Sequence, residues 1–276
     1  MDILVPVKMV PDLVEELEVN AEGTDLDRSV MRLRINEFDE HALEEALVLK
    51  DRHGARVTVL AVDTGDVDET LFTCLAKGAD RAVKITGGFQ NGVSSHTMAA
   101  VLAKVIAGMP HDLILAGVQA ADDRDGQVGV LLGATMGLPH VSVVTGVEPA
   151  GDKAVSVRQE YAGGLVAELE VDLPAVLGIQ AARQAPRYAP VSKVRQIMKT
   201  AKLEAIAAPA VDAGAGSTVR RLAKPEVTGR AEILEGSPEE VAERLCAILA
   251  ERGLVKSRRD GGPDLIGPRS TCRQAC

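Results

Sequence analysis

The sequence predicts an α/β fold built on a doubly wound, mostly parallel sheet, and two observations carry that prediction. Apolar stretches of strand length alternate with amphipathic stretches of helix length from residue 2 to residue 137, which is typical of right-handed βαβ crossovers. The core must consist of Val, Leu, Ile and Ala, because the 276 residues include no Trp, two Tyr and three Phe. Such an aliphatic composition is usual where parallel strands are buried on both faces.

Four strands are expected in this alternating region, because four short apolar runs stand between the helical stretches. An apolar run of this length that is bounded by turn signals is consistent with a buried strand of a parallel sheet. The expected strands are residues 2–10, 56–63, 81–86 and 112–117.

Four helices are expected between and after these strands, over residues 37–53, 66–78, 94–108 and 126–137. The first has a broad apolar face and is followed by Gly54 as a stop signal. The second begins with a capping box from Asp66 to Glu69 and closes at Gly78. Ser94 or Ser95 caps the third, and Gly137 ends the fourth.

The pattern changes after residue 140. Residues 141–179 form strand after strand, with turns at 149–152 and at Gly163–Gly164. This hairpin region is expected either to extend one edge of the sheet or to form a dimerisation flap.

The C-terminal third is less regular. Residues 183–202 are basic and contain proline, and residues 203–218, rich in Ala and Gly, predict a linker. Residues 237–253 predict an amphipathic helix that opens with a capping box. Its apolar face needs a partner, either the main domain or another chain. Residues 255–276 are polar and are expected to be disordered.

Charge and cysteine content exclude several classes of function. The formal charge of −9 argues against non-specific nucleic-acid binding. No run approaches the roughly 18 apolar residues of a membrane span, and MDILVPVK lacks the features of a signal peptide, so we expect a cytoplasmic protein. Cys74 is expected in the core, whereas Cys272 and Cys276 have the wrong spacing for zinc and are expected as reduced thiols in the tail.

The chain carries few candidate catalytic residues. The five His are scattered, and the metalloprotease, nucleophile-elbow, Cys-x-x-Cys and Walker motifs are missing, as is Gly-x-Gly-x-x-Gly after the first strand. Asp122, Asp123 and Asp125 resemble a Mg²⁺ site in composition, but three acids in one turn are more often solvated or capping, and we expect no metal site. We therefore expect no catalytic residue.

A nucleotide site is better supported. Ligands of open α/β sheets bind outside the carboxyl ends of the strands, where strand order reverses. These ends are expected at 6–8, 61–64 and 116–119, and the last leads into the helix start at Gly126–Gly129. Free N–H groups and the helix dipole favour an anion there. The acids of the same loop would cap backbone N–H groups, meet Arg124 or face ribose hydroxyls; the alternative is a plain helix start containing glycines.

Motifs spread along the chain resemble the beta subunit of electron-transfer flavoprotein. The resemblance covers residues 1–202 well and 219–254 loosely. The motifs are Val5–Lys8, Asn36–Asp39 with the following HALEEAL, Ala76–Arg81, Gln119–Gly129, Gly163–Gly164, Leu173–Val176, Pro186–Tyr188 and Ile197–Lys199.

The resemblance implies a heterodimer with an alpha subunit that carries the working FAD. The beta subunit would be an electron carrier without catalytic residues, holding AMP or a second FAD. It would accept electrons from a flavin dehydrogenase of the acyl-CoA dehydrogenase type and pass them towards a quinone reductase. Residues 1–202 would form the adenine-nucleotide-binding domain, and residues 203–254 the linker and arm that dock on the alpha subunit.

The resemblance also implies site residues. The backbone of Gln127–Gly129 would take the phosphate, and Asn36 would lie near the ribose or base. Residues 183–202 would form a partner-docking loop with Arg187, Tyr188 and Val191. The full cofactor set is Pro6, Asn36, Glu37, Phe38, Asp39, Thr64, Gln119, Ala120, Ala121, Asp122, Asp123, Arg124, Asp125, Gly126, Gln127, Val128, Gly129 and Val130.

The sequence departs from the family pattern at Ala162 and Val166, where acids are usual, and in the KTAK that replaces a Lys-rich run after Met198. Two other classes of function are consistent with the same architecture. One is a nucleotide-binding sensor that acts alone, and the other is an adenylating enzyme. The missing Ser-Gly-Gly-x-Asp-type loop after the first strand counts against the enzyme.

Overall fold

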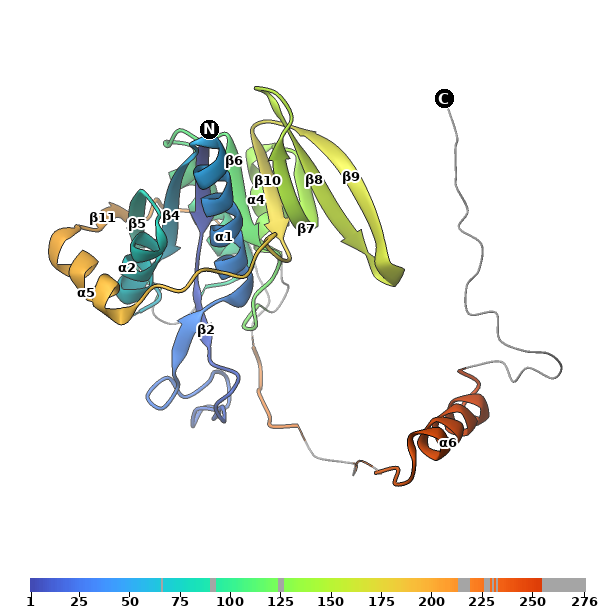
Figure 1. The fold of residues 1–276 in the computed structure, drawn as a ribbon. Coiled ribbons are helices and arrows are strands. Elements are labelled where there is room, and N and C mark those ends of the chain that lie inside the picture. The colour runs from blue at the N-terminus through green and yellow to red at the C-terminus, as the bar shows by residue number, and fades with distance from the viewer. Residues whose placement is uncertain are drawn as a thin grey trace. The chain divides into compact units, whose positions relative to one another are not determined.

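A computed structural model describes residues 1–65, 67–89, 93–123, 127–212, 219–225, 229, 231 and 233–254. The chain forms two compact units, Met1–Ala223 and Lys224–Cys276. The first unit is a large sheet covered by helices (Figure 1).

The sheet of the first unit has nine strands in the order β11-β5-β4-β1-β6-β10-β7-β8-β9. Within the described residues, every strand runs parallel to its neighbours except β8, which is antiparallel to β7 and β9. The predicted α/β fold with a mostly parallel sheet is confirmed. The strands are β1 (Asp2–Pro6), β4 (Arg56–Val62), β5 (Arg81–Thr86), β6 (Leu113–Gly117), β7 (His140–Pro149), β8 (Ala154–Tyr161), β9 (Leu165–Asp172), β10 (Ala175–Ile179) and β11 (Glu204–Ala207).

The winding of the sheet reverses between β1 and β6. From β1 the chain adds β4 and then β5 on one side, and β6 then lies on the other side of β1. The registers place Pro6 of β1 beside Leu60 of β4, and Ile3 of β1 beside Leu113 of β6. We call the carboxyl end of β1 and β6 the switch point, because crevices for ligands open at such reversals.

Helices cover both faces of the sheet. α1 (Glu37–His53) and α2 (Val67–Lys77) pack on one face, and α3 (Ser95–Ile106) and α4 (Val128–Met136) pack on the other. Expected end signals are present: the Ser94 hydroxyl accepts from Thr97 N, and Gly54 and Gly137 end their helices in the left-handed conformation. Asp66, the expected start of the capping box, lies outside the described residues.

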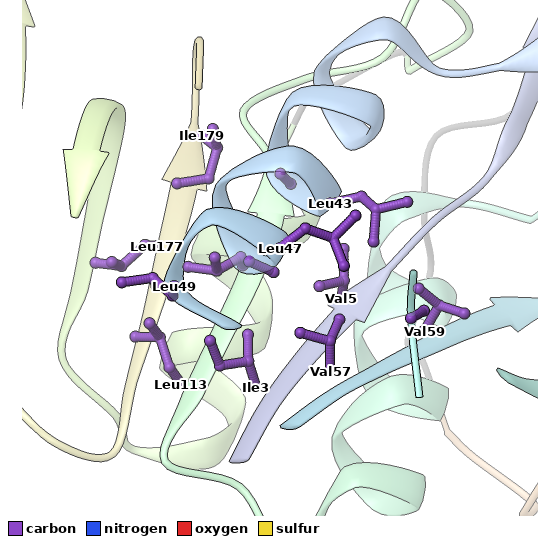
Figure 2. Close-up of a cluster of buried hydrophobic side chains, with 14 of the residues drawn as sticks. Ile3, Val5, Leu43, Leu47, Leu49, Val57, Val59, Leu113, Leu177 and Ile179 are labelled. Carbon is purple, nitrogen blue, oxygen red and sulfur yellow. The ribbon is translucent and has the colours of Figure 1, made fainter. Parts of the chain in front are cut away.

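The core on the first face is aliphatic, as the composition predicts. Leu43 and Leu47 of α1 lie over Ile3 and Val5 of β1 (Figure 2). The same cluster continues over the neighbouring strands through Val57, Val59, Leu113, Leu177 and Ile179. β1 has a second core on its other face, where Leu4 packs with the residues of α3. Its continuous apolar sequence therefore follows from burial on both sides.

The hairpin region extends the edge of the sheet, which is one of the two expected arrangements. β7, β8 and β9 follow one another in the sheet, and β8 and β9 are joined through the short 3-10 turn Ala162–Gly164. β10 then returns to a place between β6 and β7.

Three local expectations were wrong. The expected strand 2–10 divides, because Met9–Pro11 (β2) leaves the sheet and pairs with Leu33–Ile35 (β3). The expected linker 203–218 contains β11, which pairs in parallel with the open edge of β5, so the first unit continues past residue 202. The expected loop 183–202 contains helix α5 (Val191–Thr200), which packs on α2 through Val194.

The second unit contains α6 (Pro238–Glu251). Its capping box is confirmed, because Ser237 and Glu240 exchange both hydrogen bonds. The expected disordered tail, with Cys272 and Cys276, lies outside the described residues. Among the residues that are described, no helix combines the length and the apolar character needed to cross a membrane.

We expect Leu47→Ala to lower the free energy of unfolding by about 2–5 kcal/mol, because it leaves a cavity between α1 and the sheet. Leu13→Ala removes the same atoms from an exposed side chain and should change stability by less than about 0.5 kcal/mol. Urea unfolding followed by far-ultraviolet circular dichroism measures both. Equal losses would contradict the position of Leu47 in the core.

Candidate functional site

A cleft opens at the switch point. It contains about 420 Å³ of space, part of it open to solvent. Its walls come from the ends of β1, β4 and β6 and from α1, α3 and α4. The lining residues are Pro6, Val7, Lys8, Asn36, Asp39, Leu60, Val62, Met98, Leu102, Ala116, Gly117, Gln119, Ala120, Asp123 and Val128.

The structure brings together many of the residues expected at the nucleotide. Those that line the cleft are Pro6, Asn36, Asp39, Gln119, Ala120, Asp123 and Val128. Others flank it in the chain, namely Glu37, Phe38, Ala121, Asp122, Gln127, Gly129 and Val130. Arg124, Asp125 and Gly126 lie outside the described residues.

Thr64 lies outside this cleft, in the lining of a second and wider hollow. That hollow contains about 1990 Å³, much of it open solvent, and is bounded by α2 and by the small β2–β3 sheet. The chain passes directly from the lining of the cleft to that of the hollow at residues 8–9, 35–36 and 62–63. Three segments of the chain therefore contribute neighbouring residues to the two linings, and Thr64 lines the hollow and not the cleft.

Asp39 joins the two strands on either side of the switch point. Its Oδ2 accepts from Lys8 N at 3.0 Å, just after β1, and its Oδ1 accepts from Gly117 N at 3.1 Å, at the end of β6. A Cβ at Gly117 would lie 2.4 Å from Asp39 Oδ1. Glycine is therefore required there, since any side chain would push the first turn of α1 away from β6.

The environment of Asp39 changes its ionisation. Burial raises the pKa of Asp39 to about 7, against the opposing effect of hydrogen bonds from Lys8, Asn36 and Gly117 and of the Lys8 charge. Half of these carboxyls are therefore protonated near neutral pH, in the wall of the cleft.

Asn36 attaches the loop after β6 to the start of α1. It occupies the N-cap position of α1, but its side chain makes no capping bond within the described residues. Instead its Nδ2 donates to Gln119 O at 2.9 Å. The side chain thus holds the loop in place at the rim of the cleft.

The acidic loop after β6 has a partner that the sequence analysis missed. Lys8 Nζ lies 2.6 Å from Asp122 Oδ1 and 2.7 Å from Asp123 Oδ1. Burial by itself lowers the pKa of Lys8, but the two carboxylates outweigh it and raise that pKa. Lys8 was absent from the expected site, although it closes the Val5–Lys8 motif. Its position directly after a buried strand was the signal that could have identified it.

The start of α4 presents backbone N–H groups for which the described residues supply no side-chain cap. The first N–H groups of a helix have no intrahelical partner, and Gln127 at the N-cap supplies no side-chain bond to them in the described part of the chain. The first turn of α4 contains no acid. Val128, in that turn, lines the cleft. The positive end of the helix dipole therefore favours an anion at this wall.

Gly129 has a packing role in addition to any role at a phosphate. A Cβ at Gly129 would lie 3.4 Å from His140 Nε2 and 3.8 Å from Ala116 Cβ, which are both on the sheet. The missing side chain thus allows α4 to lie close to β6 and β7. Burial lowers the pKa of His140, so the ring beneath this helix start is neutral at pH 7.

The expected docking residues divide into two groups. The side chains of Tyr188 and Val191 are accessible to a partner protein, with 79% and 58% of their surface exposed. Arg187 is turned back towards α1, where it forms ion pairs with Glu44 and Asp51.

Among the described residues, no group of three or more His, Cys, Asp or Glu side chains is arranged to hold a metal ion. The cleft is therefore a site of backbone donors, one amide, ion-paired carboxylates and an apolar wall.

Comparisons with known proteins agree on one family. Residues 26–213 match the family described as Electron transfer flavoprotein domain. The Electron transfer flavoprotein subunit beta of Methylophilus methylotrophus is 37% identical over 262 residues, which cover 91% of this chain and 98% of that protein. The subunit beta of Clostridium acetobutylicum is 34% identical, with 92% and 100% covered, and that of Bradyrhizobium diazoefficiens is 31% identical, with the same coverage.

The ionisation of Asp39 predicts an unusual dependence of stability on pH. Its pKa is about 7 in the folded state and about 3.9 in an unfolded chain. Between these values the folded state binds more protons, so this contribution to stability falls as pH rises, by up to about 1.4 kcal/mol per pH unit. Asp39→Asn loses one acceptor oxygen but does not titrate. The advantage of the wild type over Asp39→Asn should therefore shrink between pH 4.5 and 7.5.

Urea unfolding across that pH range measures the two stabilities. Asp80→Asn is the matched control, because hydrogen bonds from Lys50 and Val57 outweigh burial and lower the pKa of Asp80. Asp80 is ionised in both states over this range, so the corresponding difference should stay constant. A constant difference for Asp39 as well would contradict its raised pKa.

Proposed function

The chain belongs to the electron transfer flavoprotein beta-subunit family, and from that premise we propose that it binds an adenine nucleotide in the cleft at its switch point. One observation carries the proposal: the start of α4, which no side chain of the described residues caps, and the apolar side chains of the strand ends line one cleft. An anion and a planar base joined by a sugar match that combination.

The residues present fit the parts of such a ligand. The phosphate would lie at the start of α4, where the backbone of Gln127–Gly129 supplies neutral donors. The base would pack against the apolar lining, formed by Leu60, Val62, Met98 and Leu102. Asn36 and Asp39 would face the ribose from the first turn of α1.

The acidic loop does not oppose this placement. Lys8 neutralises much of the charge of Asp122 and Asp123, because both carboxylates lie within 2.7 Å of its ammonium group. The paired charges are fixed on the β1 side of the loop, and the free donors stand at the start of α4. The phosphate would therefore meet backbone dipoles instead of unpaired carboxylates.

The ligand would be AMP or a second FAD, since both share the adenylate end. The adenylate end would lie in the cleft, and the hollow lined by Thr64 would receive the remainder of a dinucleotide. The working flavin would be an FAD carried mainly by an alpha subunit, and when bound it would supply the one- and two-electron chemistry. The residues of this chain would bind and orient cofactor and partners.

Two surfaces would serve those partners. The exposed face around Tyr188 and Val191 would receive the electron donor, a flavin dehydrogenase of the acyl-CoA dehydrogenase type. In the second unit, α6 has an apolar face that would dock on the alpha subunit, formed by exposed Leu245 and half-buried Val241 and Ile248. Electrons would leave towards a quinone reductase.

Co-purification with the alpha subunit tests this function. The heterodimer should show flavin absorption in the blue, and acid extraction followed by chromatography should release AMP or FAD in stoichiometric amount from the beta chain. A stable chain that turns over ATP and never associates with a flavin subunit would favour the stand-alone sensor instead.

Gln127→Asp tests the placement of the phosphate without harming the helix. Asp is a preferred N-cap residue, so the stability of α4 should be equal or higher. The new carboxylate would occupy the free N–H groups and repel the phosphate, and co-purified nucleotide should fall at least about tenfold, equivalent to about 1.4 kcal/mol.

Gln196→Asp on the exposed surface of α5 is the matched control, since it adds the same charge far from the start of α4 in the sequence. It should retain nucleotide as the wild type does. Full nucleotide content in Gln127→Asp, quantified by chromatography of the extract, would place the phosphate elsewhere.

A further inference from the structure

Two sequence motifs that the nucleotide site does not use meet in the structure. HALEEAL contributes Glu44 and Glu45 in the middle of α1, and the Pro-Arg-Tyr motif contributes Arg187. Residues 180–190, which we call the strap, lead from β10 to α5, and Figure 1 shows them crossing α1. Glu44 and Arg187 are 143 positions apart in the chain.

Glu44 holds the strap through one arginine. Its carboxylate is 1% exposed, and it accepts from Arg187 N at 2.8 Å, from Arg187 Nε at 3.0 and 3.1 Å, and from Arg187 Nη2 at 3.0 Å. Gln184 Nε2 donates to the same carboxylate at 2.6 Å, and Arg187 Nη2 also reaches Asp51 at 2.9 Å. Backbone and side chain of Arg187 are thus fixed together.

Glu45 holds the strap at a second point. Its carboxylate is 0% exposed and accepts from Arg183 N and Arg183 Nε, both at 3.0 Å, and from Val147 N at 2.9 Å. Arg183 also contacts Glu148 and the carbonyl of Val147. The strap is therefore attached at residues 183 and 187, one turn of α1 providing both carboxylates.

Stability alone does not explain two buried carboxylates under the strap. Burying a carboxylate carries a large desolvation penalty, and apolar residues of similar size often serve a core equally well. Paired carboxylates instead provide geometric specificity, because their hydrogen bonds with a bidentate arginine and with backbone N–H groups restrict the strap to one conformation. The residue directly after Arg187 is Tyr188, whose side chain is exposed.

The strap leads into α5, which carries a row of exposed residues that we call the stripe. Val191, Arg195 and Lys199 are spaced by four residues and are all exposed, and Val194 on the opposite side packs with α2. Arg195 and Lys199 are like charges at a spacing that weakens a helix. Residues 183–202 carry basic side chains and no acidic one, in a chain of net charge −9. The stripe is complementary to an acidic protein surface.

We propose that Glu44 and Arg187 are positioning residues, which hold Tyr188 and the stripe on α5 in the orientation that docks an acidic face of the electron-donating dehydrogenase. The inference rests on the proposed function of residues 183–202 as the docking segment. Arg187 acts through its neighbours and does not itself contact the partner.

The size of the effect follows from the fraction of time that the docking segment is correctly placed. A partner that binds one arrangement has an apparent Kd equal to its intrinsic value divided by the populated fraction of that arrangement. If the strap is released from Glu44 and takes the docking arrangement only one tenth of the time, the apparent Kd for the partner rises about tenfold. Flavin reduction that needs no protein partner would be unchanged.

The test uses the full heterodimer, co-expressed with the alpha subunit, and an acyl-CoA dehydrogenase reduced by its acyl-CoA substrate. Glu44→Gln and Arg187→Lys should raise the KM for the electron carrier at least about tenfold while kcat changes less than about twofold. Photochemical reduction of the flavin in Glu44→Gln should match the wild type. Glu204→Gln, which breaks the exposed ion pair with Arg81, is the control and should leave KM unchanged.

A double variant separates positioning from stability. Glu44→Leu with Arg187→Met replaces the ion pair by apolar groups and should retain the Tm of the wild type within a few degrees. We expect its KM to stay high, because the directional bonds are lost. A KM restored to the wild-type value in this variant would overturn the inference.

Variants of the contact surface distinguish the inference from the proposed function. Tyr188→Ala and Arg195→Glu should each raise KM, and raised ionic strength should weaken docking in the wild type. If these raise KM and Glu44→Gln does not, the positioning role is refuted and the docking segment stands. If Tyr188→Ala and Arg195→Glu leave KM unchanged, residues 183–202 are not the docking segment, and both the docking role and the positioning role fail.

Discussion

The cleft depends on one buried carboxylate. Asp39 accepts a backbone N–H from each of the two strand ends that separate at the switch point, so a single side chain fixes the distance between them. Gly117 allows this contact because a Cβ there would overlap the carboxylate. The reversal of strand order creates the opening, and Asp39 bridges the two strand ends at its edge. The neighbouring contacts of Asn36 and Lys8 then place the acidic loop on the frame that Asp39 has set.

A single helix relates the cleft to the docking segment. The first turn of α1 supplies Asp39, and its middle supplies Glu44 and Glu45. The side of the same helix that faces the sheet packs through Leu43 and Leu47. Successive functions therefore occupy successive turns of one rigid element of 17 residues. Because α1 packs on the core, the separation between the proposed nucleotide site and the proposed docking segment would be set by helix geometry and not by loops.

Local patterns predicted the elements well, and distant contacts account for what they missed. The period of apolar residues and the stop at Gly54 predicted α1 with its observed bounds, and Ser94 was one of two expected caps of α3. The partnership of Lys8 with Asp123 joins residues 115 positions apart, which no local pattern reports. β11 was mistaken for a linker because its strand character comes from the free edge of β5 and not from its Ala-rich sequence. The ion pair of Arg187 with Glu44 is likewise invisible to local patterns, because the two residues are 143 positions apart.

The late arrival of β10 has a consequence for synthesis. β6 obtains its second neighbour only when β10 enters between β6 and β7, after the whole β7–β8–β9 excursion has been made. During translation the edge of β6 stays open while three later strands emerge, and β7 is free to occupy the wrong place beside it. Long-range parallel pairing of this kind is slow and leaves strand edges exposed to aggregation. In a nascent chain of this topology the edge of β6 therefore stays without its native neighbour until residue 179 has left the ribosome.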